Sequence, residues 1–149
     1  MRALQIAGVV AAAAALAGPS ASSASAAASQ TVAIESTVTE FTPDFEGTWQ
    51  SSGAITDSGS FTEPFVRFTG STLHSPVVQA FQAVLVFTGT QGTITVRQQL
   101  TFTTETPNGV WEVLSGSGAY QGASGHGTFE FIFPNSLTFT GVMNLSRAP

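Results

Sequence analysis

The sequence predicts an all-β domain in which antiparallel strands form an eight-stranded barrel, with a two-sheet β-sandwich as the alternative. Apolar and polar residues alternate with a period of two in about eight stretches, which is the pattern of half-buried strands. Short segments containing Gly, Pro, Asn or Asp, which favour turns, join most of these stretches. No stretch shows the period of a long helix. Consecutive antiparallel strands of this number close as an up-and-down barrel or fold as a sandwich.

The first part of the chain has the features of a secretory signal peptide. Arg2 precedes an apolar run over residues 3–17, and Gly18 and Pro19 interrupt it. Small residues then offer cleavage sites near Ala26 and Ala28. The run is shorter than a membrane-spanning helix. We therefore predict that residues 1–28 are removed, that no membrane insertion follows cleavage, and that residues 29–149 form a single secreted domain.

The charge balance of this domain limits its partners. Residues 29–149 contain three arginines, nine acidic residues and no lysine, which gives 3 − 9 = −6. Nucleic acids and anionic membrane surfaces both require clustered cations, so neither is an expected partner. The chain has no cysteine, which excludes disulfides, and its 12 phenylalanines are typical of a folded core. The alanine-rich leader suggests a bacterial source.

Strands are predicted along the first half of the domain as follows. Residues 31–41 place Val32, Ile34 and Val38 on one face, and residues 42–44 form a turn. Residues 47–56 form the next strand, and residues 57–59 form a turn by composition. Residues 61–69 form a weaker strand because Pro64 is suited only to an edge, a strand start or a bulge. A loop over residues 70–76 is expected to follow.

Residues 77–104 predict a hairpin. Residues 77–88 are the most apolar segment, and residues 88–92 have the composition and length of a hairpin loop. In residues 93–104, Ile94, Val96 and Leu100 share one face with Gln98, while threonines and Arg97 take the other. Gln98 is the polar residue on an otherwise apolar face, so it either bonds to neighbouring backbone or points into a wet cavity. The sequence leaves these two alternatives equal.

Residues 111–133 are predicted to organise the fold, because a glycine-rich turn here joins two strands. Residues 119–121 are expected to form a single helical turn inside it. Phe129, Phe131 and Phe133 occupy alternate positions, so they share one strand face and are expected to be buried together. Turns over residues 107–109 and 134–135 flank the stretch, and a final strand spans residues 136–146. We expect a positive φ at one or more of four glycines of the turn: Gly116, Gly118, Gly122 and Gly125.

The pattern W-x-V-x-S-G-S-G-A-Y-x-G-x-x-G-x-G-T-F, over residues 111–129, resembles the glycine-rich turn of the allene oxide cyclase-like barrel superfamily. That superfamily includes plant dirigent proteins and secreted bacterial proteins of unassigned role. The resemblance implies a calycin-like, eight-stranded antiparallel barrel with a central cavity, often oligomeric. The functional carboxylates and arginines of the cyclases and dirigents match no positions here, so the resemblance carries over neither activity.

Several catalytic and metal-binding motifs are excluded or weakened. The missing lysine excludes a P-loop, and the glycine spacing after Gly116 is one residue too long for a dinucleotide fingerprint. His126 occupies the place of the second glycine in a nucleophile elbow. His74, His126 and Glu130 could supply two histidines and one carboxylate to a metal. Exposure of His126 and Glu130 on the solvated face is the favoured interpretation, so no metal or cofactor is predicted.

The preferred function is that of a secreted barrel that binds a small apolar molecule in its cavity. We expect Trp49, Gln98 and Trp111 to lie nearest to that molecule. Gly116, Gly118, Tyr120, Gly122 and Gly125 are assigned to the structural turn. One alternative is an enzyme of the cyclase or isomerase type, which requires an inward carboxylate or arginine, with Arg67 as the best candidate. The other is a structural or interaction protein at the cell surface, with a filled interior and an outer face that forms a homo-oligomer.

Overall fold

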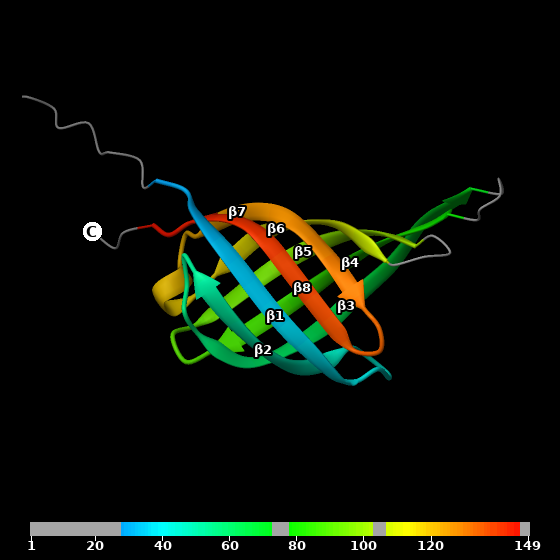
Figure 1. Cartoon of the computed structure of the whole chain (residues 1–149), viewed down its shortest axis with the longest axis horizontal. Coiled ribbons are helices and arrows are strands. Elements are labelled where there is room, and N and C mark those ends of the chain that lie inside the picture. The colour runs from blue at the N-terminus through cyan, green and yellow to red at the C-terminus, as the bar shows by residue number, and fades with distance from the viewer. Residues whose placement is uncertain (1–27, 73–77, 103–106, 147–149) are drawn as a thin grey trace, which may run out of the picture.

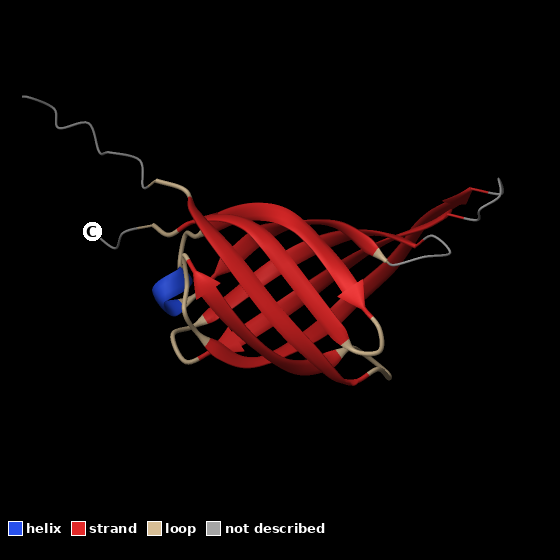
Figure 2. Ribbon diagram, in the orientation of Figure 1, coloured by secondary structure: helices blue, strands red, loops and turns tan. Residues whose placement is uncertain are grey.

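The protein is a closed antiparallel barrel of eight strands, which confirms the predicted fold class. The computed structural model describes residues 28–72, 78–102 and 107–146. Each strand pairs with the next along the chain, and β8 pairs with β1 to close the sheet (Figures 1 and 2). The predicted signal peptide and His74 lie outside the described residues. The strands are β1 (Gln30–Glu40), β2 (Glu46–Gly53), β3 (Ser58–Thr72), β4 (Val78–Gly89), β5 (Thr93–Phe102), β6 (Asn108–Gly116), β7 (Ser124–Ile132) and β8 (Ser136–Asn144).

The up-and-down order gives the barrel two ends, each formed by different connections between strands. The connections β2–β3, β4–β5 and β6–β7 meet at one end, where β1 also begins and β8 also ends (Figure 1). We call this the closed end. The connections β1–β2 and β7–β8 lie at the opposite end, which we call the mouth. Beyond the mouth, β3 and β4 continue past the rest of the wall as a two-stranded ribbon (Figure 2).

The core lies inside the barrel because strand side chains alternate between its two faces. On β1 the inward residues are Val32, Ile34, Ser36 and Val38, as the alternation predicts. Aromatic rings fill much of the interior, and Phe87 contacts the rings of Trp49, Phe61 and Phe139. The larger fully buried side chains include Tyr120, Phe61, Phe87, Phe139, Ile34, Leu85, Ile94 and Met143.

Aromatic residues on the inner face repeatedly stand opposite glycines on the neighbouring strand. Phe61 pairs with Gly47, and Phe129 pairs with Gly109. A Cβ built on Gly47 would lie 2.8 Å from Cε1 of Phe61, and one on Gly109 would lie 2.9 Å from Cε1 of Phe129. The glycines therefore leave the space that the rings occupy, as in sheets where an aromatic ring covers a glycine on the next strand.

The glycine-rich turn between β6 and β7 forms the closed end, and its predicted helical turn is present one residue earlier than expected. A 3-10 helix, η1 (Gly118–Tyr120), occupies this connection. Gly118 and Gly122 have φ values of 60° and 72°, which confirms a positive φ within the predicted set. Strand β7 begins at Ser124, so the last two glycines of the stretch, Gly125 and Gly127, belong to a strand rather than to the turn.

Three local predictions were wrong or shifted. Phe133 is 66% exposed, whereas Phe129 and Phe131 are buried, because β7 ends at Ile132 and the alternation stops there. Residues 58 and 59 begin β3, and residues 108 and 109 begin β6, where turns were predicted. Strand β3 also runs on to Thr72, into the predicted loop. Pro64 does lie at an irregularity, since the register shifts between Thr62 and Phe65.

Candidate functional site

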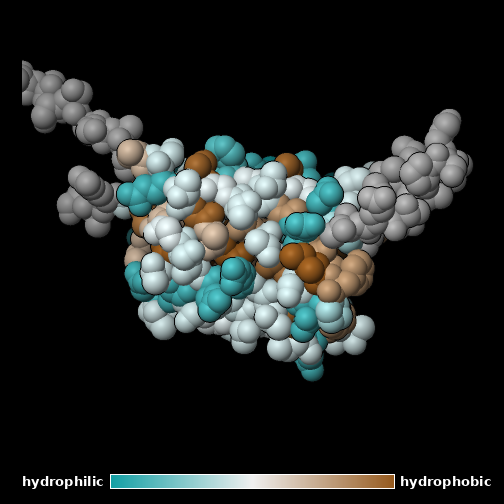
Figure 3. Space-filling model, in the orientation of Figure 1, coloured by the Kyte–Doolittle hydropathy of each residue, from teal (hydrophilic) through white to brown (hydrophobic). Residues whose placement is uncertain are grey.

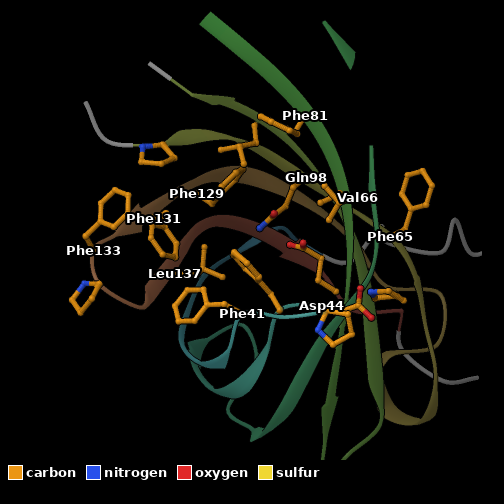
Figure 4. Close-up of a pocket in the computed structure, with 18 residues that line it drawn as sticks. Phe41, Asp44, Phe65, Val66, Phe81, Gln98, Phe129, Phe131, Phe133 and Leu137 are labelled. Carbon is orange, nitrogen blue, oxygen red and sulfur yellow. The ribbon is translucent and has the colours of Figure 1, made fainter. Parts of the chain in front are cut away.

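A cavity of about 710 Å³ opens at the mouth of the barrel (Figure 4). Its volume is in the range of small-molecule sites. The β1–β2 and β7–β8 connections contribute to it, together with Pro107 and the mouth-side halves of β3, β4, β5, β7 and β8. Fifteen of its 18 lining residues are apolar: Phe41, Pro43, Phe45, Pro64, Phe65, Val66, Phe81, Ala83, Leu100, Pro107, Phe129, Phe131, Phe133, Pro134 and Leu137.

The rim of the cavity exposes large apolar side chains to solvent. Phe41, Phe65, Val66 and Phe133 are each more than two-fifths exposed and also line the cavity. The space-filling view shows hydrophobic residues gathered at the end of the molecule where β7 ends, against a mostly weakly polar wall (Figure 3). The rings of Phe131 and Phe133 meet edge to face with centroids 5.0 Å apart, which links the rim to the interior. An apolar molecule would therefore meet aromatic surface from the entrance inward.

Gln98 is the polar residue that β5 turns into this cavity. Its side chain is 3% exposed and points inward among the phenylalanines (Figure 4). The amide Nε2 is buried and has no hydrogen-bond partner. Of the two alternatives that the sequence left equal, the cavity position is therefore the observed one, and Nε2 makes no bond to neighbouring backbone. A buried amide without a partner is costly, so an acceptor supplied by a bound molecule would relieve this cost.

Glu63 is a second polar group in the cavity, and sequence reasoning missed it. It lies two residues after Phe61 on β3, faces inward with it and is 8% exposed. Its backbone N–H donates to the carbonyl oxygen of Phe45 at 2.9 Å, which fixes β3 against the β1–β2 connection. Burial, and then the negative charge of Asp44, raise the pKa of Glu63 to about 7. The period-two alternation from Phe61 was the signal that could have found it.

Trp49 and Trp111 are not among the residues that line this cavity, although Trp111 pairs with Gln98 across β5 and β6. Both are buried, and both indole N–H groups have backbone partners. Trp49 Nε1 donates to the carbonyl oxygen of Thr88 at 3.2 Å, and Trp111 Nε1 donates to that of Thr128 at 3.0 Å. The structure thus brings Gln98 to the cavity and places the two tryptophans in the core.

Tyr120 and the assigned glycines lie at the opposite end of the barrel. The hydroxyl of Tyr120 donates to Oδ2 of Asp57 at 2.7 Å. The carboxylate of Asp57 also accepts hydrogen bonds from the N–H groups of Ser58, Thr90 and Gln91 and from the Thr90 hydroxyl. Burial alone would raise the pKa of Asp57, but the hydrogen bonds outweigh it and hold that pKa well below its usual range. This cluster joins all three connections of the closed end.

The remaining charged candidates lie on the outer wall. Arg67 is exposed, and its guanidinium donates to Oε1 of Gln82 at 3.4 Å, so it does not face the cavity. Arg97 forms an ion pair with Glu112 across β5 and β6, and this places Glu112 on the outer wall. His126 and Glu130 are exposed on β7. Among the described residues, no group of three His, Asp or Glu side chains could hold a metal ion.

Comparison with family models and with curated proteins finds no match to this chain. Neither comparison assigns a family. Within the part of the chain that the structure describes, no helix has the length and apolar character needed to cross a membrane. The function is therefore inferred from the cavity and its three polar lining residues, Asp44, Glu63 and Gln98.

Proposed function

We propose that the protein is a secreted small barrel that binds a small, largely apolar molecule in the mouth cavity. The observation that carries the proposal is the unpartnered amide of Gln98, buried inside a cavity with walls that are otherwise mostly apolar. Specific ligand sites are typically apolar pockets with a few polar groups that fix orientation. The resemblance of residues 111–129 to the cavity-containing barrel superfamily supports the same function.

Within this proposal, the aromatic walls supply affinity and Gln98 supplies orientation. Binding in the cavity removes apolar surface of the ligand and of the rim from water. Each Å² buried in this way stabilises the complex by roughly 25 cal/mol. The Nε2 amide of Gln98 donates to an oxygen of the ligand and gains the partner that it lacks in the free protein. Trp49 and Trp111 support the wall from within the core and do not touch the ligand.

Binding of N-phenyl-1-naphthylamine, an uncharged apolar dye that becomes fluorescent in apolar surroundings, tests this proposal. We expect a saturable fluorescence increase with one site per chain. Ala83, on β4 opposite Gln98, lines the cavity, and Ala83→Leu should weaken binding at least tenfold by filling it. Val110→Leu, on the exposed outer face of β6, is the matched control and should bind normally. Equal binding by both variants, or no dye binding by the wild type, would contradict the proposal.

Native mass spectrometry of protein purified from its own host gives an independent test. A retained small molecule that is lost in Ala83→Leu would support the cavity as its site. The same spectrum reports the oligomer mass, which tests the alternative of a cell-surface interaction protein.

An isomerase or cyclase remains a second candidate because of Glu63. That alternative requires an inward carboxyl group, and Glu63 faces the cavity with a pKa of about 7, in the range suited to proton transfer near neutral pH. If the bound molecule identified by mass spectrometry is chemically converted by the wild type and not by Glu63→Gln, the protein is an enzyme. Unchanged ligand with both proteins would exclude this candidate.

A further inference from the structure

The charged groups of the mouth cavity are all acidic. Glu63 and Asp44 line it, and none of its 18 lining residues is Lys, Arg or His. Arg67 and Arg97 both have partners on the outer wall. In the described part of the chain, therefore, neither cavity carboxyl group has a basic partner in an ion pair.

Glu63 lies where burial and a neighbouring negative charge make its charged form unfavourable. It is 8% exposed among apolar side chains, and the charge of Asp44 acts on it from the β1–β2 connection. A buried carboxylate is normally paired with a cation or bonded to several donors. The described residues supply neither to its side chain, so a cation from outside would compensate both carboxyl groups at once.

The walls of the cavity also favour a cation. Seven of the lining residues are phenylalanines, and the faces of aromatic rings attract organic cations. A hydrated inorganic cation would gain little from these rings, whereas an organic amine can place its apolar body against them and its nitrogen near the carboxylates. The cavity therefore suits an organic cation better than a metal ion.

Gln98 adds an observation that does not depend on the acidic groups. Its Nε2 is a buried hydrogen-bond donor without a partner, and the side chain points into the same cavity (Figure 4). A donor cannot pair with an ammonium group, which has only donors. It therefore requires an acceptor on the ligand, such as an ether, carbonyl or hydroxyl oxygen.

We infer that the molecule bound at the mouth is an apolar organic amine that also carries an oxygen acceptor, with Glu63 and Asp44 facing its cationic nitrogen and Gln98 bound to its oxygen. The inference rests on the proposed function and names the chemical class of its ligand. Neutral and acidic molecules of the same shape lack the ion pairs, and an acid would in addition be repelled by both carboxylates.

Three probes of one shape test the inference: 3-(1-naphthyloxy)propylamine, 3-(1-naphthyloxy)propan-1-ol and 3-(1-naphthyloxy)propionic acid. All three share the aromatic body and the ether oxygen and differ in charge. At about pH 8 the amine is a cation, the acid is an anion and Glu63 is ionised. Isothermal titration calorimetry should rank the amine at least tenfold tighter than the alcohol, with the acid weakest. An alcohol that binds as tightly as the amine would overturn the inference.

Variants of Glu63 and Asp44 test whether these two carboxyl groups cause the preference for the amine over the alcohol. Glu63→Gln should bring the affinity of the amine to within about threefold of that of the alcohol. Asp44→Asn should also lower the ratio of amine affinity to alcohol affinity, by a smaller factor. Glu130→Gln, an exposed acid on the outer face of β7, is the matched control and should leave the ratio unchanged. Asp44 is exposed in a connection, so its variant keeps the test valid if Glu63→Gln does not fold. A ratio that persists in both Glu63→Gln and Asp44→Asn would also overturn the inference.

The probes separate failure of the inference from failure of the proposed function. If the amine and the alcohol bind equally and Ala83→Leu weakens both, the cavity binds apolar molecules without selecting cations. If none of the three probes binds and N-phenyl-1-naphthylamine does not bind either, the proposed function itself is wrong.

Discussion

The hydroxyl of Tyr120 donates a 2.7 Å hydrogen bond to Oδ2 of Asp57, which lies 63 positions earlier in the chain. Tyr120 belongs to η1 between β6 and β7, and Asp57 belongs to the connection between β2 and β3. The same carboxylate accepts from Thr90 and Gln91 between β4 and β5. One side chain thus holds together three connections that are distant in sequence.

Tyr120→Phe is expected to destabilise the protein by about 1.5–3 kcal/mol, the range for a hydrogen bond to a charged group. The ring would still fill its buried site, so the loss reports the hydroxyl. The midpoint of urea unfolding measures it. Thr39→Val, which removes an exposed hydroxyl hydrogen bond to the Glu46 carbonyl oxygen, should cost less than about 0.5 kcal/mol. Equal midpoints for Tyr120→Phe and wild type would show that the bond is not stabilising.

Glu63 is expected to make the protein less stable as pH rises from about 4.5 to about 7. Its pKa is raised in the folded protein from 4.5 to about 7, so the folded state binds the proton more tightly than the unfolded state does. The favourable contribution is complete below the unfolded pKa and is lost as pH rises through the folded one. The two values imply a loss of about 3 kcal/mol.

Urea unfolding of the wild type and of Glu63→Gln at pH 5 and at pH 8 measures this effect. The difference in stability between the two proteins should change by up to about 3 kcal/mol in favour of Glu63→Gln at pH 8. Glu130→Gln should track the wild type at both pH values. A constant difference between wild type and Glu63→Gln would contradict the buried, acid-flanked environment of Glu63.

Gly118→Ala is expected to destabilise the protein by more than the ~1 kcal/mol of an ordinary glycine-to-alanine change. Its φ is 60°, and a new Cβ would lie within 2.4 Å of the carbonyl oxygen of Gln91. Thermal unfolding measures the effect. Ala119→Gly, at the neighbouring exposed position, should change stability by no more than about 1 kcal/mol. An unchanged melting temperature for Gly118→Ala would show that the turn adapts to alanine.

Phe129→Ala and Phe133→Ala are expected to differ strongly although both residues line the cavity. Phe129 is buried and stacks against Phe139 with centroids 5.6 Å apart, so its truncation should cost about 3–5 kcal/mol. Phe133 is largely exposed and should cost less than about 1 kcal/mol. Chemical unfolding of both variants tests this, and similar losses would place Phe133 in the core after all.

The alternation of apolar residues predicted the antiparallel strands and most strand faces, because a one-residue slip would turn a whole strand inside out. By itself it left both a barrel and a two-sheet sandwich open. It failed where strands end. Phe133 continues the pattern of Phe129 and Phe131, yet the strand stops at Ile132 and the side chain turns to solvent. Composition also assigned residues 57–59 to a turn, whereas the side chain of Asp57 makes the turn and Ser58 already belongs to β3.

The candidate site was predicted less completely than the fold. Gln98 could be found because it interrupts an apolar face, and it lines the cavity. Glu63 was missed because Pro64 weakened the strand prediction here, and the register shift between Thr62 and Phe65, which includes Glu63, depends on pairing with β4. The tryptophans were expected beside the ligand, whereas both are buried in the core and neither lines the cavity. Which layer of a barrel a ring occupies depends on the stagger of all eight strands, which no single strand encodes.

The position of β1 and β8 has a practical consequence for handling the molecule. β1 begins and β8 ends at the closed end, where the hydroxyl of Ser146 donates to the carbonyl oxygen of Gly122 at 2.8 Å. Whatever is attached to the domain through either end of the described chain therefore approaches from the side away from the cavity. A domain immobilised by its C-terminus on a sensor surface would present its entrance to the solution. Ligand capture can thus be measured on tethered protein, with the entrance free.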